Sequence, residues 1–402
     1  MGESTSATIP ALEGGSPVRA GAPVPFFRAA ISDADVQAVV DTLRSGWLTL
    51  GPRTAEFEAA CAARLQAAHA VATSSCTAAL FLALEALGVG PGDEVVVPSL
   101  TFAASVNTIL HTGAEPVLAD IETESFGLDP DEVEALLGPR TRGIVAVDYA
   151  GQPCRIRELR ELARRHGLFL LEDAAHAFGA ALDGIPVGSL ADATAFSFYA
   201  TKCITTGEGG LLTCGDAALA ERVRLLGHHG MQRDAWKRYS ERGTWYYEVD
   251  VPGYKCNMTD VQAALGLSQL GREAELRASR TEVARSYARA FAAEPALELP
   301  GVRAGAEHAW HLYVVRLRRE RLRIDRDAFA RALREEGIVP SVHFIPYHRH
   351  PVGRALALRR PLPRTEDFAA RCLSLPLFPH MPARDRQDVV DAVVKLLRHY
   401  AS

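Results

Sequence analysis

Between residues 68 and 173 the sequence alternates short apolar runs with helix-like stretches. Apolar runs this short, which do not alternate with polar residues, are typical of strands buried on both faces. Regular alternation with helices is typical of a parallel sheet covered by helices. The sequence therefore predicts an α/β fold with a mostly parallel central sheet, whose strands we place at residues 70–73, 94–97, 116–120, 143–148 and 168–171.

Length and composition predict two domains after a terminal tail. The chain has 402 residues, of which 48% are hydrophobic and 23% charged, enough for one large domain and a smaller one. Residues 1–24, rich in Gly, Ser, Pro and Ala, predict a flexible tail. We expect a large domain over residues 25–270. After it, Arg- and Glu-rich helices at 272–291, 326–336 and 384–400 predict a smaller C-terminal α+β domain over 271–402.

Several classes of protein are disfavoured by the same numbers. A net charge of −5 gives no footprint for nucleic acid or an anionic membrane. The sequence has no apolar run long enough to span a bilayer, and its start lacks the pattern of a signal peptide. The seven cysteines are odd in number and scattered, which favours reduced thiols in the cytoplasm.

The segment Ser197-Phe-Tyr-Ala-Thr-Lys202 follows an apolar run and precedes a glycine turn and a second apolar run. Lys202 could be an ordinary solvated loop lysine. The alternative is a lysine that forms a Schiff base, which needs a water-poor pocket to lower its pKa and a nearby hydroxyl for a cofactor phosphate.

Other polar and aromatic residues are predicted at the same sheet edge, because ligands of such folds bind at the carboxyl ends of the strands. Taken singly, each has a structural explanation as a helix cap or a core residue. Together they supply the amine, carboxylate, ring contact and hydroxyls that pyridoxal phosphate (PLP) requires. The set comprises Ser75, Cys76, Thr77, Phe102, Asp173, His176, Ser197 and Lys202.

Six motifs give a resemblance to a known family. They are SGWLTLGP at 45–52, TSSCTAAL at 73–80, GDEVVVPSLTF at 92–102, EDAAHAFG at 172–179, SFYATK at 197–202 and GYKCNMTDVQAA at 253–264. From about residue 25 to its end, the chain resembles the DegT/DnrJ/EryC1/StrS aminotransferases. These are fold-type I PLP-dependent transferases that mostly act on nucleotide-linked keto sugars.

The resemblance implies a role for each residue of the set. Lys202 matches the lysine that binds the cofactor and moves protons, and Asp173 matches the carboxylate paired with the pyridine nitrogen. His176 stands beside the ring where many members have glutamine. Phe102 matches a stacking aromatic, and the phosphate cradle corresponds to Ser75, Cys76, Thr77 and Ser197.

A homodimer with shared active sites is implied by Asn257. In the family, the matching residue reaches the phosphate from the neighbouring subunit. The structural alternative for Asn257 is the N-cap of a helix over residues 260–270.

The resemblance also implies the reaction. L-glutamate, or less often glutamine, donates an amino group to a keto sugar in amino-sugar biosynthesis. The motifs at 253–260 and 342–348 look most like those of members that aminate C4 of an NDP-4-keto-6-deoxyhexose or a UDP-4-keto-pentose. The alternatives are C3 amination of an NDP-3-keto sugar, a non-sugar cyclic ketone as acceptor, and a non-catalytic sensor or scaffold with the same fold.

Candidate substrate contacts come from two segments rich in His and Tyr. Residues 245–247, His228 and His229 could line the sugar pocket, as could the dense loop at 340–351. The loop histidines lack the carboxylate or cysteine pattern of a zinc site, so no metal is expected. The candidates, with surface packing as the alternative, are His228, His229, Tyr254, His343, Tyr347 and His348.

Overall fold

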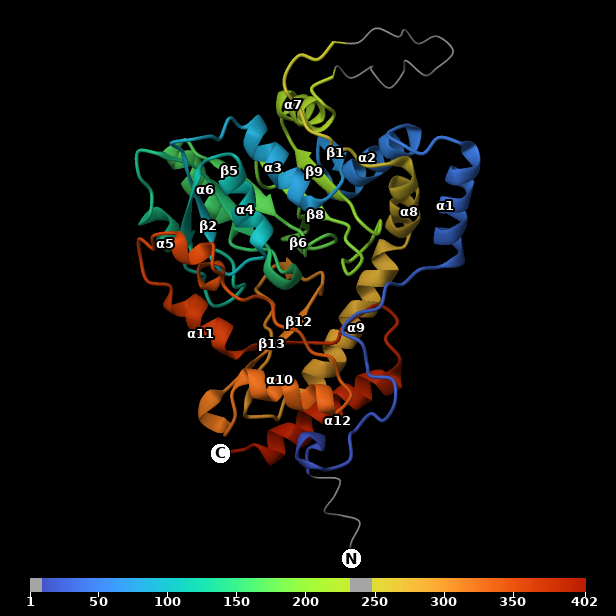
Figure 1. Ribbon diagram of the computed structural model, residues 1–402, viewed down its shortest axis with the longest axis vertical. Coiled ribbons are helices and arrows are strands. Elements are labelled where there is room, and N and C mark those ends of the chain that lie inside the picture. The colour runs from blue at the N-terminus through green and yellow to red at the C-terminus, as the bar shows by residue number, and fades with distance from the viewer. Residues whose placement is uncertain (1–8, 232–247) are drawn as a thin grey trace, which may run out of the picture.

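The computed structural model describes residues 9–231 and 248–402, and its main feature is a seven-stranded sheet (Figure 1). The strand order is β1-β9-β8-β5-β4-β2-β3. All pairings from β8 to β3 are parallel, and β9 runs antiparallel to both neighbours. The predicted mostly parallel sheet is confirmed. Its strands are β1 (His69–Thr73), β2 (Glu94–Pro98), β3 (Glu115–Ala119), β4 (Thr141–Val147), β5 (Phe169–Asp173), β8 (Ala193–Ser197) and β9 (Gly210–Cys214).

Helices cover both faces of this sheet, as the continuously apolar strands require. On β2, Val95 and Val97 belong to the core formed with α3 and α4, whereas Val96 belongs to the core formed with α6. This alternation follows from the two-residue period of a strand. The helices of this domain are α1 (Asp33–Ser45), α2 (Pro52–Leu65), α3 (Cys76–Ala86), α4 (Ala103–His111), α5 (Pro130–Glu134), α6 (Ile156–His166), α7 (Ala217–Gly227) and α8 (Asp260–Gly271).

A long helix, α9 (Glu273–Phe291), connects this layer to a smaller one (Figure 1). The smaller layer packs α9 and two further helices, α10 (Arg326–Glu335) and α12 (Ala383–His399), on a three-stranded antiparallel sheet. That sheet contains β10 (Leu297–Glu298), β12 (Tyr313–Leu317) and β13 (Cys372–Leu375), with α11 (Pro363–Arg371) preceding β13. The three expected helices lie within one residue of their predicted ends.

A third, small sheet crosses the expected boundary near residue 270. Strand β11 (Ala306–Glu307) pairs with β6 (Ala181–Leu182), which also pairs with β7 (Ile185–Pro186). Backbone pairs thus join the two predicted domains. The boundary at residue 270 stays a prediction.

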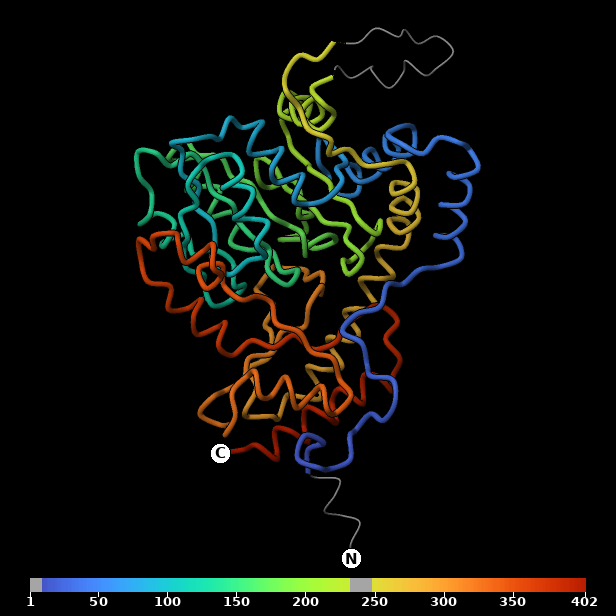
Figure 2. Tube along the Cα trace, in the orientation of Figure 1, coloured from blue at the N-terminus to red at the C-terminus, as the bar shows by residue number. Residues whose placement is uncertain are grey.

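The described part of the N-terminal segment differs from the flexible tail expected over residues 1–24. It packs along the smaller layer (Figure 2). The N–H groups of Ala11 and Val18 both donate to the Glu336 carboxylate, at 2.9 Å each. Val24 is fully buried and pairs with Ile338. Composition suggested mobility, but these tertiary contacts fix residues 9–24; residues 1–8 lie outside the described part of the chain.

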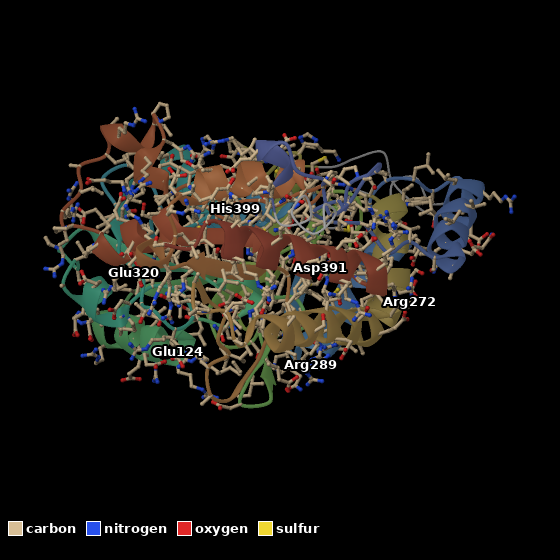
Figure 3. All side chains as sticks on the ribbon, turned by 90° about the horizontal axis from the view of Figure 1, so that it is seen from below. Glu124, Arg272, Arg289, Glu320, Asp391 and His399 are labelled. Atoms are coloured by element: carbon tan, nitrogen blue, oxygen red, sulfur yellow. The ribbon has the colours of Figure 1, made fainter. Side chains whose placement is uncertain are left out.

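The surface carries charges of both signs. Figure 3 shows acidic and basic side chains spread over the same face, among them Glu124, Arg272, Arg289, Glu320, Asp391 and His399. All seven cysteines lie in the described residues and are free thiols. Within residues 9–231 and 248–402, no helix combines the length and apolar character needed to cross a membrane.

Glu336 tests the role of the N-terminal segment. Its side chain is fully buried and pairs with Lys395, whose Nζ lies 2.9 Å from Glu336 Oε1. We expect Glu336→Ala to lower the free energy of unfolding by about 3 kcal/mol, because it strands a buried cation and two backbone donors. The exposed neighbour Glu335 provides the control, and Glu335→Ala should change stability by less than about 0.5 kcal/mol in the same urea titration.

Candidate active site

The carboxyl ends of four sheet strands bring predicted site residues to one edge. Ser75 follows β1, Phe102 follows β2, Asp173 ends β5 and Ser197 ends β8. These four strands are mutually parallel, so their ends lie on the same side of the sheet. Lys202 follows Ser197 by five residues and lies in the loop between β8 and β9.

Lys202 lies in a low-polarity environment that favours its neutral form. The residue is partly buried, and its backbone N–H donates to the carbonyl of Tyr199 at 2.9 Å. Burial lowers the pKa of the Lys202 amine, against which the nearby Cys76 and Asp173 act to raise it. A lowered pKa increases the neutral fraction of an amine, which is the form that acts as a nucleophile or a base.

Asp173 is a buried carboxylate held by three neighbours. Ser105 donates to its Oδ2 at 2.6 Å and the Ala175 N–H to its Oδ1 at 3.1 Å, while the Cys76 thiol lies 3.9 Å from Oδ1. Burial raises the pKa of Asp173, and the hydrogen bond from Ser105 opposes this rise. The net shift is upward, so a further positive group in contact with Asp173 would stabilise its ionised form.

Three histidines lie near the Lys202 amine. The His176 ring lies 4.3 Å from the His311 ring, between centroids. Burial lowers the pKa of both rings well below the usual value and that of His343 to about 4, and the charge of Lys202 lowers all three further. All three are therefore neutral at physiological pH. The Ala150 N–H donates to His176 Nδ1 at 3.3 Å, which assigns the ring proton to Nε2.

Aromatic rings extend from His176 to the surface. Phe344 lies stacked at 5.7 Å from His176 and tilted at 5.9 Å from Phe102, between ring centroids. Phe102 is 60% exposed, which is unusual for so large an apolar side chain. Its exposure at a strand end, beside the buried polar groups, is typical of a surface that a ligand covers.

The first turn of α3 can hold an anion. Ser75 is its N-cap and accepts from the Ala78 N–H at 3.1 Å, while Thr77 is exposed. Strand β9 passes close to this turn at Gly210, where a Cβ atom would lie 2.5 Å from the Cys76 nitrogen, so only glycine fits. Ser197 is buried and accepts from the Tyr199 N–H at 3.3 Å. Free N–H groups at a helix start attract phosphate.

Asn257 lies in a second group of predicted residues. Its backbone pairs with Thr73, and its side chain lines a cavity of about 670 Å³ together with His228. The lining of this cavity includes none of Lys202, Asp173 and His176. The interpretation of Asn257 as a helix N-cap is wrong, because Thr259 caps α8 through a capping box with Gln262. Asn257 Oδ1 is buried and has no hydrogen-bond partner among the described residues.

The other substrate candidates are spread out. His229 donates its N–H to the Tyr254 carbonyl at 2.8 Å, and Tyr254 is 37% exposed. Tyr347 is buried and its hydroxyl donates to Asn107 Oδ1 at 2.7 Å. His348 is bonded on one side to Ser99 and on the other to Glu366. These partners favour a structural role for Tyr347 and His348; residues 245–247 lie outside the described residues.

Four residues of the site were not singled out from the sequence, although Phe344 lies in the candidate loop at 340–351. Ser105 binds Asp173, His311 and Phe344 contact His176, and Arg280 contacts the Lys202 loop. The missed signal for Ser105 was its place one turn after Phe102. The other three come from the smaller layer, where no strand-end rule applies.

Two further buried acids, Asp148 and Glu172, lie close to Asp173. Their ligand atoms and the Cys154 sulfur lie within 4.8 Å of one another. Burial raises the pKa of both carboxyls; Asp148 raises the pKa of Glu172 further, whereas a hydrogen bond with Glu172 lowers that of Asp148. Asp148 Oδ2 and Glu172 Oε1 have no hydrogen-bond donor among the described residues. One proton shared by the two carboxyls would satisfy both oxygens.

Comparison with known proteins identifies the family of this chain. The model of the DegT/DnrJ/EryC1/StrS aminotransferase family matches residues 29–394. The chain belongs to this family. It is 47% identical to the spore coat polysaccharide biosynthesis protein SpsC of Bacillus subtilis, over 93% of this chain and 97% of SpsC. The protein is therefore an aminotransferase with the fold-type I architecture, as the sequence predicts.

Solved relatives in the aminotransferase family have the same fold. The putative sugar aminotransferase Spr1654 of Streptococcus pneumoniae, in its PLP form, is 32% identical, with a TM-score of 0.87 over 94% of this chain and 99% of Spr1654. It is also solved in a PMP form. DesI, solved in the presence of its TDP-sugar product, is 34% identical, with a TM-score of 0.85 over 95% of this chain and 94% of DesI.

The shared proton of Asp148 and Glu172 can be tested through stability. Both carboxyls have a raised pKa in the folded state, so folding binds protons and stability falls as pH rises above the unfolded value of about 4. Asp148→Asn removes one acid and keeps an acceptor for the Cys154 N–H. The buried neutral histidines act in the opposite sense, so the change in the wild type is a sum of both effects. Relative to the wild type, we expect Asp148→Asn to gain about 1 kcal/mol or more of stability between pH 5 and pH 8.

Urea titrations at the two pH values provide the measurement. Asp391→Asn, a change at an exposed aspartate of α12, is the matched control and should follow the wild type. Equal pH dependence of wild type and Asp148→Asn would show that both acids are ionised in the folded protein.

Proposed function

We propose that this aminotransferase binds PLP at Lys202 and transfers an amino group from L-glutamate, or glutamine, to a keto sugar. The acceptor we propose is C4 of an NDP-4-keto-6-deoxyhexose, used in amino-sugar biosynthesis. The observation that carries the proposal is one sheet edge that holds a lysine with a lowered pKa, a buried carboxylate and a helix N-terminus.

These residues fit PLP on their own chemistry. Asp173 is buried with a raised pKa and would be stabilised by a protonated pyridine nitrogen. The start of α3, with Ser75 and Ser197 beside it, would hold the phosphate. His176, neutral with its proton on Nε2, would offer a donor beside the ring, and Phe102 an apolar surface. The carboxylate, the phosphate contacts and the apolar ring contact that PLP requires thus come from the ends of separate strands.

Lys202 and Asp173 would have different roles in the proton transfers. PLP supplies an electron sink for the carbanion that forms when an amino acid loses its Cα proton. Lys202 Nζ, whose neutral form burial favours by lowering its pKa, would accept that proton and later return it, as general base and then general acid. A protonated ring nitrogen in contact with Asp173 would favour the ionised form of this carboxyl. The neutral His176 and His311 add no positive charge that would compete with it.

A nucleotide sugar as acceptor is supported by relatives and by the mouth of the site. DesI was solved with its TDP-sugar product, and SpsC is named for polysaccharide biosynthesis. In this chain the exposed apolar side chains Phe102, Tyr199 and Ile345 lie in segments around the site. The preference for C4 rests on the resemblance of the motifs at 253–260 and 342–348.

The first experiment follows the visible absorbance of the PLP-loaded protein. We expect L-glutamate to abolish the band and one member of a panel of 4-keto and 3-keto nucleotide sugars to restore it. Restoration by a 4-keto sugar supports C4 amination, and restoration only by a 3-keto sugar would replace it. If glutamate and glutamine both left the band unchanged, the aminotransfer proposal would fail.

Substitution of the lysine is the control for the cofactor. Lys202→Ala removes the amine that would bind PLP and should lose the band and at least about 10³-fold in activity. Lys395→Arg is the matched control, because Lys395 pairs with Glu336 in the smaller layer and the change keeps that ion pair, so it should leave the band unchanged.

We also propose a homodimer in which Asn257 of the partner subunit completes each site. Two observations support it. The Asn257 side chain faces a cavity of about 670 Å³ that excludes the Lys202 site of its own chain. Its buried Oδ1 has no partner among the described residues, which leaves an acceptor for a group from outside the chain.

Mixed dimers test the shared site. We expect Lys202→Ala and Asn257→Ala to be impaired separately, the second at limiting PLP. After the two are unfolded together and refolded, half of the dimers should be hybrids, and one site in each hybrid should have both residues. Activity should then return to about a quarter of the wild-type value. No recovery, with dimers confirmed by light scattering, would place Asn257 outside the partner's site.

A further inference from the structure

A buried cation with no carboxylate partner among the described residues lies behind the Lys202 loop. Arg280, on α9, is 3% exposed. The hydrogen bonds of its guanidinium go to backbone carbonyls, and its Nε has no partner in the described part of the chain. Arginine is rarely buried unless a carboxylate pairs with it. An exception this close to the reacting amine calls for a functional explanation.

The carbonyls that Arg280 binds belong to three separate segments. Its Nη2 donates to Thr201 and Lys202, at 3.4 and 3.3 Å, in the loop that carries the amine. Its Nη1 lies within 3.5 Å of the carbonyls of Trp310, His311 and Leu377 in the smaller layer. Each bond is long and therefore weak, but the planar fork joins the lysine loop to the segment that carries His311.

The charge of Arg280 acts on the same amine. The titratable groups that face Lys202 are Cys76 from α3, Asp173 from β5, Cys203 from its own loop and three neutral histidines. Burial, the largest influence on the pKa of Lys202, favours the neutral amine, and so does Arg280, whereas Asp173 and the two thiols favour the protonated amine. Burial also lowers the pKa of Arg280, but an arginine side chain keeps its charge near neutral pH, so its effect on Lys202 is constant there.

We propose that Arg280 is a positioning residue for Lys202. It anchors the lysine loop to the smaller layer by its backbone carbonyls and places a fixed positive charge beside the amine. The proposal deepens the proposed function of Lys202, but it concerns the amine itself and needs neither PLP nor a sugar to be tested.

The test measures the reactivity of Lys202 in the full-length protein, freed of bound aldehyde by dialysis against hydroxylamine. Limiting acetic anhydride is added between pH 6 and pH 11, and acetylation of Lys202 is quantified by mass spectrometry against Lys255. In Arg280→Met we expect the pKa of Lys202 to rise by about half to one unit, so that labelling at pH 8 falls about three- to tenfold.

Two further variants separate charge from hydrogen bonding. Arg280→Lys keeps the charge and should label like the wild type at pH 8. Arg280→Gln keeps a donor but loses the charge and should label like Arg280→Met, which also covers the case in which Arg280→Met does not fold. Hydrogen exchange of the peptide over residues 198–206 should be faster in Arg280→Met, because its anchor is lost.

Arg277, one turn earlier on α9, provides the matched control. Its guanidinium binds the Glu307 carboxylate at 3.2 Å, away from the lysine loop. Arg277→Met should change neither Lys202 labelling nor exchange at 198–206. If Arg280→Met and Arg280→Gln lowered thermal stability but left Lys202 labelling unchanged, Arg280 would be a packing residue only and the proposal would be overturned. A failure of glutamate to alter the PLP band would instead refute the aminotransfer, without affecting this result.

Discussion

The site depends on a close backbone contact between the two layers. Gly151, just after β4, accepts from the Ala309 N–H at 2.8 Å, and Ala150 accepts from the Leu312 N–H at 3.2 Å. Gly151 has a φ of +101°, and a Cβ there would lie 2.8 Å from the His176 carbonyl oxygen and 3.1 Å from the His311 nitrogen. Only glycine permits this approach, which brings His311 against His176.

Burial then sets the charge state of nearly every group in the site. His176, His311 and His343 are neutral because burial lowers their pKa values and the cation of Lys202 adds to the effect. Lys202 itself is shifted toward the neutral amine by the same burial. The smaller layer supplies His311 and His343, so it controls the polarity around an amine that belongs to the large one.

The sequence predicted the site residues that the large sheet positions, but few of those that the smaller layer contributes. Asp173 and Ser197 end strands, so the strand-end rule placed them together. Ser105 and Arg280 lie within helices, and their roles depend on which face each helix turns to a distant loop. The N-terminal segment also differs from its prediction because of distant contacts. Its hydrogen bonds with Glu336 join residues more than 300 positions apart, and composition carries no information about such contacts.

The two buried charge systems around the site act in complementary directions. Asp148 and Glu172 lie behind Asp173, and the charge of Asp173 raises the pKa of both. By reciprocity, each negative charge on the pair would raise the pKa of Asp173. A proton held by the pair therefore keeps Asp173 able to ionise, while Arg280 on the other side keeps Lys202 able to lose its proton. Both effects favour the forms that the proposed cofactor site needs, an ionised carboxylate and a neutral amine, although burial still raises the pKa of Asp173.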